Sequence, residues 1–280
     1  MTTITQKGAT GPLSLFKQAW SANPANQPAG TAGTGNYDSD LSNLIGSKWD
    51  TSDGGTVALV QNGAVAIASG KLCQAPTEIT AFEKLAMTVP TAYPATVGAT
   101  QILVTNGATV LKQNLFAGGY IVTASGTGIG QRLQIGSHQA AANGATFVVT
   151  LADPVAVTLD ATTTVSLIAN NYNGILISNH STLGVPVGVS LYPLSASTAP
   201  TYDGTSGLLT VNGVAQYGFI TTSGAATCLI DALTNVGYPV GPSTNTDGAL
   251  NVATLTSSPQ VGISGQTQTS TQAGLVYLQL

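Results

Sequence analysis

The sequence predicts an all-β protein, built from two small β-sandwich or barrel-like lobes that follow an extended N-terminal arm. Asn-Gly and Asp-Gly pairs, which favour tight turns between strands, recur from Asp53-Gly54 to Asp247-Gly248. Between them lie short runs rich in Val, Ile, Thr and Tyr, several of which alternate apolar with polar residues. Helical patterns are confined to two short pieces, residues 14–20 and 79–87. We therefore expect less than about 15% helix, well below the usual share.

The first element is the arm, residues 1–45, which is polar and rich in Gly, Ala, Asn and Pro. A segment of this composition cannot bury enough apolar surface to fold alone. Positions 13, 16 and 20 fall on one face of a short helix, and Pro12 suits its first turn. We expect this patch to bind a partner subunit, the alternative being that it packs on the protein's own body. The patch consists of Leu13, Leu15, Phe16 and Trp20.

Three further zones follow the arm. Residues 46–90 are expected to form a short β-rich connector. Residues 91–170 are dense in predicted strands and form a first β-domain. Residues 171–280, entered through "NNYNGILI", form a second β-domain.

The stretch "GTGIGQRLQIGSH", residues 126–138, superficially resembles a phosphate-binding loop. Its glycines, Gly126, Gly128 and Gly130, have the spacing G-x-G-x-G, whereas a dinucleotide fingerprint needs G-x-G-x-x-G followed by a helix. The following residues, "QRLQIGSH", are typical of a strand. We therefore interpret the glycines as a structural turn and predict no nucleotide cofactor.

The charge pattern limits the possible partners. Only 6% of the residues are charged, and residues 133–280 contain no Lys or Arg. Proteins that bind nucleic acid or anionic lipid depend on Lys and Arg side chains. No apolar run approaches the roughly 18 residues that a membrane span needs. We expect neither nucleic acid nor membrane as a partner. The low charge favours a chain that works inside an assembly.

No arrangement of residues typical of a catalytic or metal site is present in the sequence. The two histidines, His138 and His180, lie in no metal-binding motif, and the two cysteines are far apart. Asp153 and Asp160 resemble a glycosidase pair only in type. Asp153 precedes Pro154, which indicates a structural turn, and Asp160 lies in a Thr-rich turn. We therefore predict that the protein is not an enzyme and needs no cofactor or metal.

A longer stretch resembles a known family. "VGATQILVTNGATVLKQNLFAGGYIVTASGTGIGQRLQIGSHQAAANGATFVVTLADPVAVTL", followed by "NNYNGILI", is similar to the proteins that decorate the heads of tailed bacteriophages, cyanophage-like ones in particular. "YGFITTSGAATCLIDAL", "VGPSTNTDGAL", "PQVGISGQT" and "LVYLQL" continue the resemblance, which covers residues 46–280. The family usually has Trp where this chain has Phe219. The matching positions are Asn114, Phe116, Gly118–Tyr120, Gly126–Gln131, Ile135, His138, Leu151, Asp153 and Pro154.

The resemblance implies a non-enzymatic virion protein that binds the outer surface of an icosahedral phage capsid and clamps neighbouring capsid subunits. Its expected partners are the major capsid protein, which the arm would bind, and further copies of itself, with a trimer favoured over a dimer. The alternative is a tail-fibre or receptor-binding adhesin, although the sequence has no fixed repeat and few aromatic platforms. A phage-borne glycan hydrolase is a weaker alternative, because the acidic residues are scattered.

Overall fold

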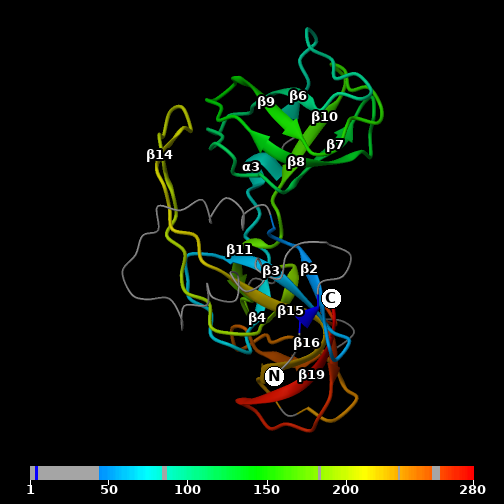
Figure 1. Ribbon diagram of the computed structural model, residues 1–280, viewed down its shortest axis with the longest axis vertical. Helices are drawn as coiled ribbons and strands as arrows, with labels where there is room; N and C mark the ends of the chain where they lie inside the picture. Colours follow the sequence, from blue (N-terminus) through cyan, green and yellow to red (C-terminus); the bar gives the residue numbers. More distant parts are fainter. Residues whose placement is uncertain (1–3, 6–43, 84–86, 182–183, 233, 254–258) are drawn as a thin grey trace. The chain divides into compact units, whose positions relative to one another are not determined.

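A computed structural model describes residues 4–5, 44–83, 87–181, 184–232, 234–253 and 259–280 (Figure 1). Strands account for 45% of it and helix for 2%, which confirms the predicted all-β class and its barrel-like lobes. The chain divides into two compact units. The larger unit takes its residues from Met1–Pro76, Asn171–Thr198 and Val214–Leu280, and the smaller from Thr77–Asn170 and Ala199–Gly213.

The smaller unit is a closed six-stranded barrel (Figure 1). Its strands close in the order β10-β5-β6-β9-β8-β7, and every neighbouring pair is antiparallel. A short helix precedes the first strand. The elements are α3 (Thr80–Glu83), β5 (Met87–Thr88), β6 (Gln101–Thr105), β7 (Tyr120–Ser125), β8 (Arg132–His138), β9 (Thr146–Leu151) and β10 (Thr164–Ile168). A separate ribbon of β13 (Thr201–Tyr202) and β14 (Leu209–Val211) belongs to the same unit.

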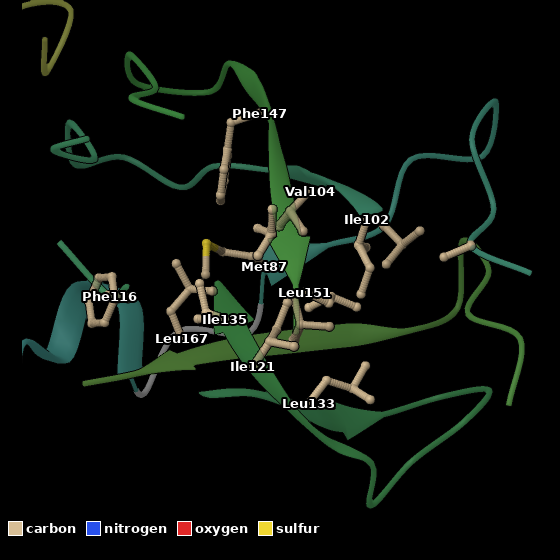
Figure 2. Packing of buried hydrophobic residues seen from close by; sticks show 14 of the residues in the cluster. Met87, Ile102, Val104, Phe116, Ile121, Leu133, Ile135, Phe147, Leu151 and Leu167 are labelled. Carbon is tan, nitrogen blue, oxygen red and sulfur yellow. The ribbon is translucent and has the colours of Figure 1, made fainter. Parts of the chain in front are cut away.

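Alternating side chains fill the interior of this barrel. In β9, for example, Phe147, Val149 and Leu151 point inward and the residues between them are more exposed. Figure 2 shows these inward side chains meeting those of β5, β6, β7, β8 and β10. Each fully buried Leu, Ile or Phe stabilises the fold by about 1.5–3 kcal/mol. The interior is therefore a packed core.

The larger unit contains an eleven-stranded sheet in which one long strand, β15 (Tyr217–Ile230), is shared between two closed circuits. The first half of β15 pairs with β3 and β12, and β11 and β4 complete a circuit of five strands. Its second half pairs with β17 and β19, and β16 and β18 complete another circuit of five. The other strands are β1 (Ile4–Thr5), β2 (Lys48–Thr51), β3 (Thr56–Asn62), β4 (Leu72–Gln74), β11 (Asn173–Ile177), β12 (Pro186–Ser190), β16 (Pro239–Pro242), β17 (Leu250–Val252), β18 (Gly262–Ser264) and β19 (Gln272–Gln279).

Each circuit has its own apolar core. Val60 and Ile220 belong to the core of the first circuit, and Cys228 and Val276 to that of the second. Strand β3 is buried on both faces, because Val57 and Leu59 pack against Trp49 and Phe219 outside the first circuit. A strand buried on both faces has a continuous apolar run, which explains the sequence "VALV".

Pairs of reciprocal backbone hydrogen bonds close the connections at the barrel ends. Leu111 and Ala141 exchange N–H···O bonds of 2.8 and 3.0 Å in the smaller unit, and Ile67 and Leu194 exchange bonds of 2.9 and 2.7 Å in the larger unit. All four side chains are buried. Each pair therefore satisfies main-chain groups and adds apolar side chains to the core.

The observed units differ from the domain boundaries expected from the sequence. Residues 46–90 were expected to be a connector, yet β2, β3 and β4 are part of the larger unit, and α3 and β5 are part of the barrel. Along the sequence, the larger unit takes segments from both before and after the residues that form the barrel. The physical reason is long-range pairing, since β3 pairs with β11 and with β15. Composition along the chain does not reveal such partners.

The sequence has five Asn-Gly pairs, which begin at Asn62, Asn106, Asn143, Asn173 and Asn212. The pair at Asn143 lies in the connection between the antiparallel strands β8 and β9. None of the five asparagines has the positive φ that a two-residue hairpin turn requires at its first position. Instead, Asn62 and Asn106 are buried, and their side-chain amides donate to carbonyl oxygens of neighbouring loops. The three Asp-Gly pairs do lie in hairpin connections, between β2 and β3, β13 and β14, and β16 and β17.

Candidate functional site: the loop end of the six-stranded barrel

The glycine-rich stretch forms the turn between β7 and β8. Gly126, Gly128 and Gly130 have φ values of +77°, +77° and +87°, which side chains other than glycine rarely adopt. A Cβ at Gly126 would collide with the carbonyl oxygen of Thr162, so the two chains approach closely here. Strand β8 follows the turn directly, where a phosphate-binding motif would place a helix. The glycines therefore build a tight turn in contact with the connection between β9 and β10.

Side-chain hydrogen bonds lock this turn against that connection. The side-chain oxygen of Gln131 accepts the N–H groups of Ala156 and Val157 at 2.9 Å, and its Nε2 donates to the carbonyl of Val157 at 2.9 Å. The side chain of Gln131 thus satisfies main-chain groups of Ala156 and Val157 that a neighbouring strand would otherwise satisfy.

Asp160 fixes the other side of the same turn. Its carboxylate accepts hydrogen bonds from the hydroxyls of Thr162 at 2.6 Å and Thr127 at 2.7 Å. These bonds, first from Thr162 and then from Thr127, lower the pKa of the partly exposed Asp160. The carboxylate therefore stays ionised at neutral pH and serves as an anchor for the turn.

A third loop, between β5 and β6, is joined to the same place. Ala95 and Leu159 exchange backbone hydrogen bonds of 2.9 and 2.8 Å, and the N–H of Val155 donates to the carbonyl of Ala99 at 2.9 Å. The N–H of Gly98 also donates to the carbonyl of Val155 at 2.8 Å. The three loops are thus one hydrogen-bonded assembly, at the barrel end opposite the one where the chain enters β5 and leaves β10.

These loops expose three large aliphatic side chains, which we call the barrel-end patch. Ile129, between two positive-φ glycines, is 67% exposed, Val97 is 64% exposed and Val157 is 49% exposed. Val97 and Val157 lie opposite each other, because the pairs on either side of them, Ala95–Leu159 and Ala99–Val155, are hydrogen-bonded. Rigid, exposed apolar side chains are typical of a protein-binding surface.

The electrostatics around the patch are mildly acidic. The three loops contain Asp153 and Asp160 and no Lys, Arg or His. Asp153 and Pro154 lie in the bend after β9, with the Asp153 side chain exposed. Within the described part of the chain, the carboxylate of Asp153 accepts no hydrogen bond that would hold this bend.

The titratable side chains that the structure describes do not converge into a catalytic arrangement. His138 lies in the barrel core, where burial lowers its pKa; its Nε2 accepts the N–H of Phe116 at 3.0 Å. His180 is bonded to Asp247 at 2.8 Å in the other unit. Both cysteines, Cys73 and Cys228, are buried free thiols. Among the described residues, no group of three or more His, Cys, Asp or Glu could hold a metal ion.

A cavity of about 430 Å³ lies in the larger unit where β12, β15 and β19 meet. Its lining is small and uncharged, for example Ser190, Ala226 and Leu275. The hydroxyl of Ser190 is already engaged, since it donates to the carbonyl of Ala68 at 2.6 Å and accepts the N–H of Lys71 at 2.9 Å. The lining contains no Asp, Glu, His, Lys, Arg or Cys, so the cavity presents no acid or base to a ligand.

The sequence identified the turn glycines but not the side chains that they display. A signal was available, because Ile129 is a large aliphatic residue enclosed by glycines in a turn. The predicted arm patch of Leu13, Leu15, Phe16 and Trp20 lies outside the described residues, so its docking stays a prediction.

The described residues contain no helix that is long and apolar enough to cross a membrane. Comparison of the chain with protein-family models, curated proteins and solved structures found no significant match.

Proposed function

We propose that this protein is a non-enzymatic component of a virion, which binds the outer surface of an icosahedral phage capsid and clamps neighbouring capsid subunits. The resemblance of residues 46–280 to head decoration proteins supports the proposal. Its partners would be the major capsid protein and further copies of itself. A ligand that binds only the assembled lattice stabilises that lattice by mass action, so no reaction is required of it.

The barrel-end patch is the observation that carries this proposal furthest. Ile129, Val97 and Val157 present aliphatic side chains on loops that Gln131 and Asp160 already hold in place. Because the loops are ordered before binding, little conformational entropy is lost when a partner covers them. An aliphatic knob in a complementary protein pocket is a common centre of binding energy.

The two-unit organisation fits a clamping role. Each unit has its own core, so each can hold a binding surface independently of the other. When two linked units bind two neighbouring capsid subunits, the second contact forms at a high effective concentration. Weak individual contacts then hold the pair of subunits firmly together.

An adhesin is the second candidate, and Tyr93 favours it. Tyr93 is exposed in the loop between β5 and β6, the loop that also contains Val97. Exposed tyrosine rings are used to stack on sugars. A Tyr93→Ala variant that loses binding to host cells while still binding capsids would assign this second role.

Binding to purified phage heads that lack this protein tests the main proposal. We expect the wild-type protein to saturate such heads in co-sedimentation, and Ile129→Asp to weaken binding by about tenfold or more, because a buried Ile contributes about 1.5–3 kcal/mol.

Ala108→Asp is the matched control, because Ala108 is exposed on the connection between β6 and β7, at the opposite end of the same barrel, so this variant should bind heads like the wild type. Failure of the wild-type protein to bind heads would overturn the proposed function. If Ile129→Asp binds heads with unchanged affinity, the patch is not part of the interface, but the proposed function still holds.

A further inference from the structure

The five Asn-Gly pairs are places where the main chain can react with a neighbouring side chain. The nitrogen of the residue after an Asn can attack the side-chain amide and close a five-membered ring, and Gly leaves that nitrogen unhindered because it has no Cβ. Ring closure requires that the Asn side chain is free to turn and that the N–H of the Gly is free of hydrogen bonds. The fold therefore determines which of the five pairs can react.

Hydrogen bonds of the side chain hold the pairs at Asn62 and Asn106. The amide of Asn62 donates to two carbonyl oxygens, at 2.9 and 2.7 Å, and the N–H of Gly63 donates to the carbonyl of Ile175 at 2.9 Å. The amide of Asn106 donates to loop carbonyl oxygens at 2.8 and 3.0 Å. Both asparagines are also buried. Neither side chain can turn towards the main-chain nitrogen without breaking these bonds.

The pairs at Asn143 and Asn173 are held through the main chain. The N–H of Gly144 donates to the carbonyl of Gly107 at 2.9 Å, so the nitrogen after Asn143 is engaged. Asn173 and Gly174 belong to strand β11, which pairs with β3 on one edge and with β4 on the other. Four of the five pairs are thus fixed in the folded protein.

The pair at Asn212, directly after β14, differs from the other four. Asn212 is exposed, and its side chain makes no hydrogen bond to any residue that the structure describes. The N–H of Gly213 likewise donates to no group in the described part of the chain. Main-chain pairing resumes only at Val214, whose N–H donates to the carbonyl of Thr198 at 2.9 Å. Both groups that ring closure needs are therefore free at this pair.

We propose that Asn212 is a site of spontaneous covalent modification, at which the side-chain amide becomes a carboxylate. The nitrogen of Gly213 attacks Cγ of Asn212 and forms a C–N bond, and the side-chain nitrogen leaves as ammonia with the proton that Gly213 loses. Water then opens the ring at one of its two carbonyl carbons, which leaves aspartate or isoaspartate at position 212. The attack is intramolecular, so water is the only co-reactant that the change needs.

The modification changes a part of the chain that has no charge of its own. Residues 204–230 contain no Asp, Glu, Lys or Arg, and the new carboxylate lies between the exposed Val211 and Val214. Isoaspartate also adds one carbon to the main chain where the smaller unit ends, at Gly213. Older molecules therefore carry a more polar and more negative surface here. This inference does not depend on the capsid-binding role.

Peptide mapping by mass spectrometry tests the proposal on the full-length protein. During incubation in mildly alkaline buffer, we expect conversion at Asn212 to be about tenfold or more faster than at the other four pairs, which must first open locally. In concentrated urea all five pairs should convert at similar rates, because the fold no longer protects four of them. Similar rates in the folded protein would overturn the proposal, as would a difference that persists in urea.

Two glycine substitutions test the route through Gly213. Gly213→Ala places a Cβ beside the attacking nitrogen, and we expect conversion at Asn212 to slow by about tenfold. The φ of Gly213 is not positive, so its backbone suits Ala. Gly204→Ala is the matched control, because Gly204 lies in the turn of the same ribbon with open space around it and should leave the rate unchanged. Equal rates for the two variants would contradict ring closure through Gly213.

Discussion

His138 shows how one buried polar side chain ties together the barrel core. Its ring lies beside Phe116 and Phe147, with centroid separations of 6.0 and 6.2 Å. Nε2 accepts a hydrogen bond from Phe116, so Nδ1, which lies 2.9 Å from the carbonyl of Gln139, carries the ring proton. Both ring nitrogens are satisfied only in the neutral form, and burial lowers the pKa.

The stability of the barrel should therefore fall in mild acid. Because the folded-state pKa of His138 lies below its usual value near 6.5, its stabilising effect is full above pH 6.5. The effect is lost as the pH falls below 6.5 towards the folded-state pKa, by at most about 1.4 kcal/mol per pH unit. Urea titrations between pH 7 and 5 should show this loss for the wild type and a smaller loss for His138→Gln.

The comparison with His138→Gln isolates the histidine from the other titrating groups. Burial raises the pKa of Glu83, so the contribution of Glu83 changes in the opposite direction as the pH falls. Both proteins contain Glu83, and the difference between them removes it. Parallel pH profiles for the two proteins would contradict the role assigned to His138.

At the scale of elements, the main feature is that β15 serves two barrels. Its pairing with β3 and β12 completes one circuit, and its pairing with β17 and β19 completes the other. Near the middle of the strand Gly224 has a φ of +84°, and a Cβ there would lie 2.5 Å from the Cα of Gly55. A side chain at this position is opposed both by the backbone angle and by the connection between β2 and β3, which contains Gly55.

We expect Gly224→Ala to destabilise both five-stranded circuits together, by about 2–3 kcal/mol, through backbone strain and overpacking. Calorimetry should show two transitions, with the larger unit's transition lowered and that of the six-stranded barrel unchanged. Gly237→Ala is the control, because Gly237 has the same kind of φ, +82°, but open space around it, so its cost is only the backbone term. Circuits that unfold separately in hydrogen exchange would show that β15 does not couple them.

The sequence allowed the elements to be predicted better than their partners. Alternating runs such as "TFVVTL" and the three Asp-Gly turns identify strands and hairpins, because these are local signals. The circuits through β15 depend on pairings between distant segments, which no local pattern encodes. The Asn-Gly pairs at Asn62 and Asn106 fit the same hairpin pattern, although both asparagines are buried, because the burial of an asparagine cannot be recognised from its local sequence.

The barrel-end patch, too, could be predicted from the sequence only in part. The glycines at 126, 128 and 130 could be recognised as a turn from their spacing. The exposure of Val157 could not, because it lies in the apolar run "VAVTL", which is typical of a buried strand, and nothing local to Val97 places it opposite Val157. Their exposure follows from the loops that bring them to one barrel end.

At the scale of the whole molecule, the scarcity of charge determines how binding responds to salt. Only 6% of residues are charged, and the three loops around the barrel-end patch have no Lys or Arg. The binding therefore depends little on electrostatic attraction between charged side chains, which is the attraction that salt screens. We expect the affinity for phage heads to change less than about threefold between about 50 and 500 mM NaCl. A steep loss in co-sedimentation over this range would point to a charged interface instead.

The locked loops at the barrel end also have an evolutionary consequence. Val97, Ile129 and Val157 project into solvent, so their side chains contribute little to the barrel's own stability. The backbone beneath them is held by Gln131, Asp160 and paired main-chain groups, none of which depends on which aliphatic residue is displayed. Mutation can therefore vary the surface while the scaffold persists. When the surface of the partner changes, single substitutions in the patch can therefore restore binding, and none of these substitutions needs to destabilise the fold.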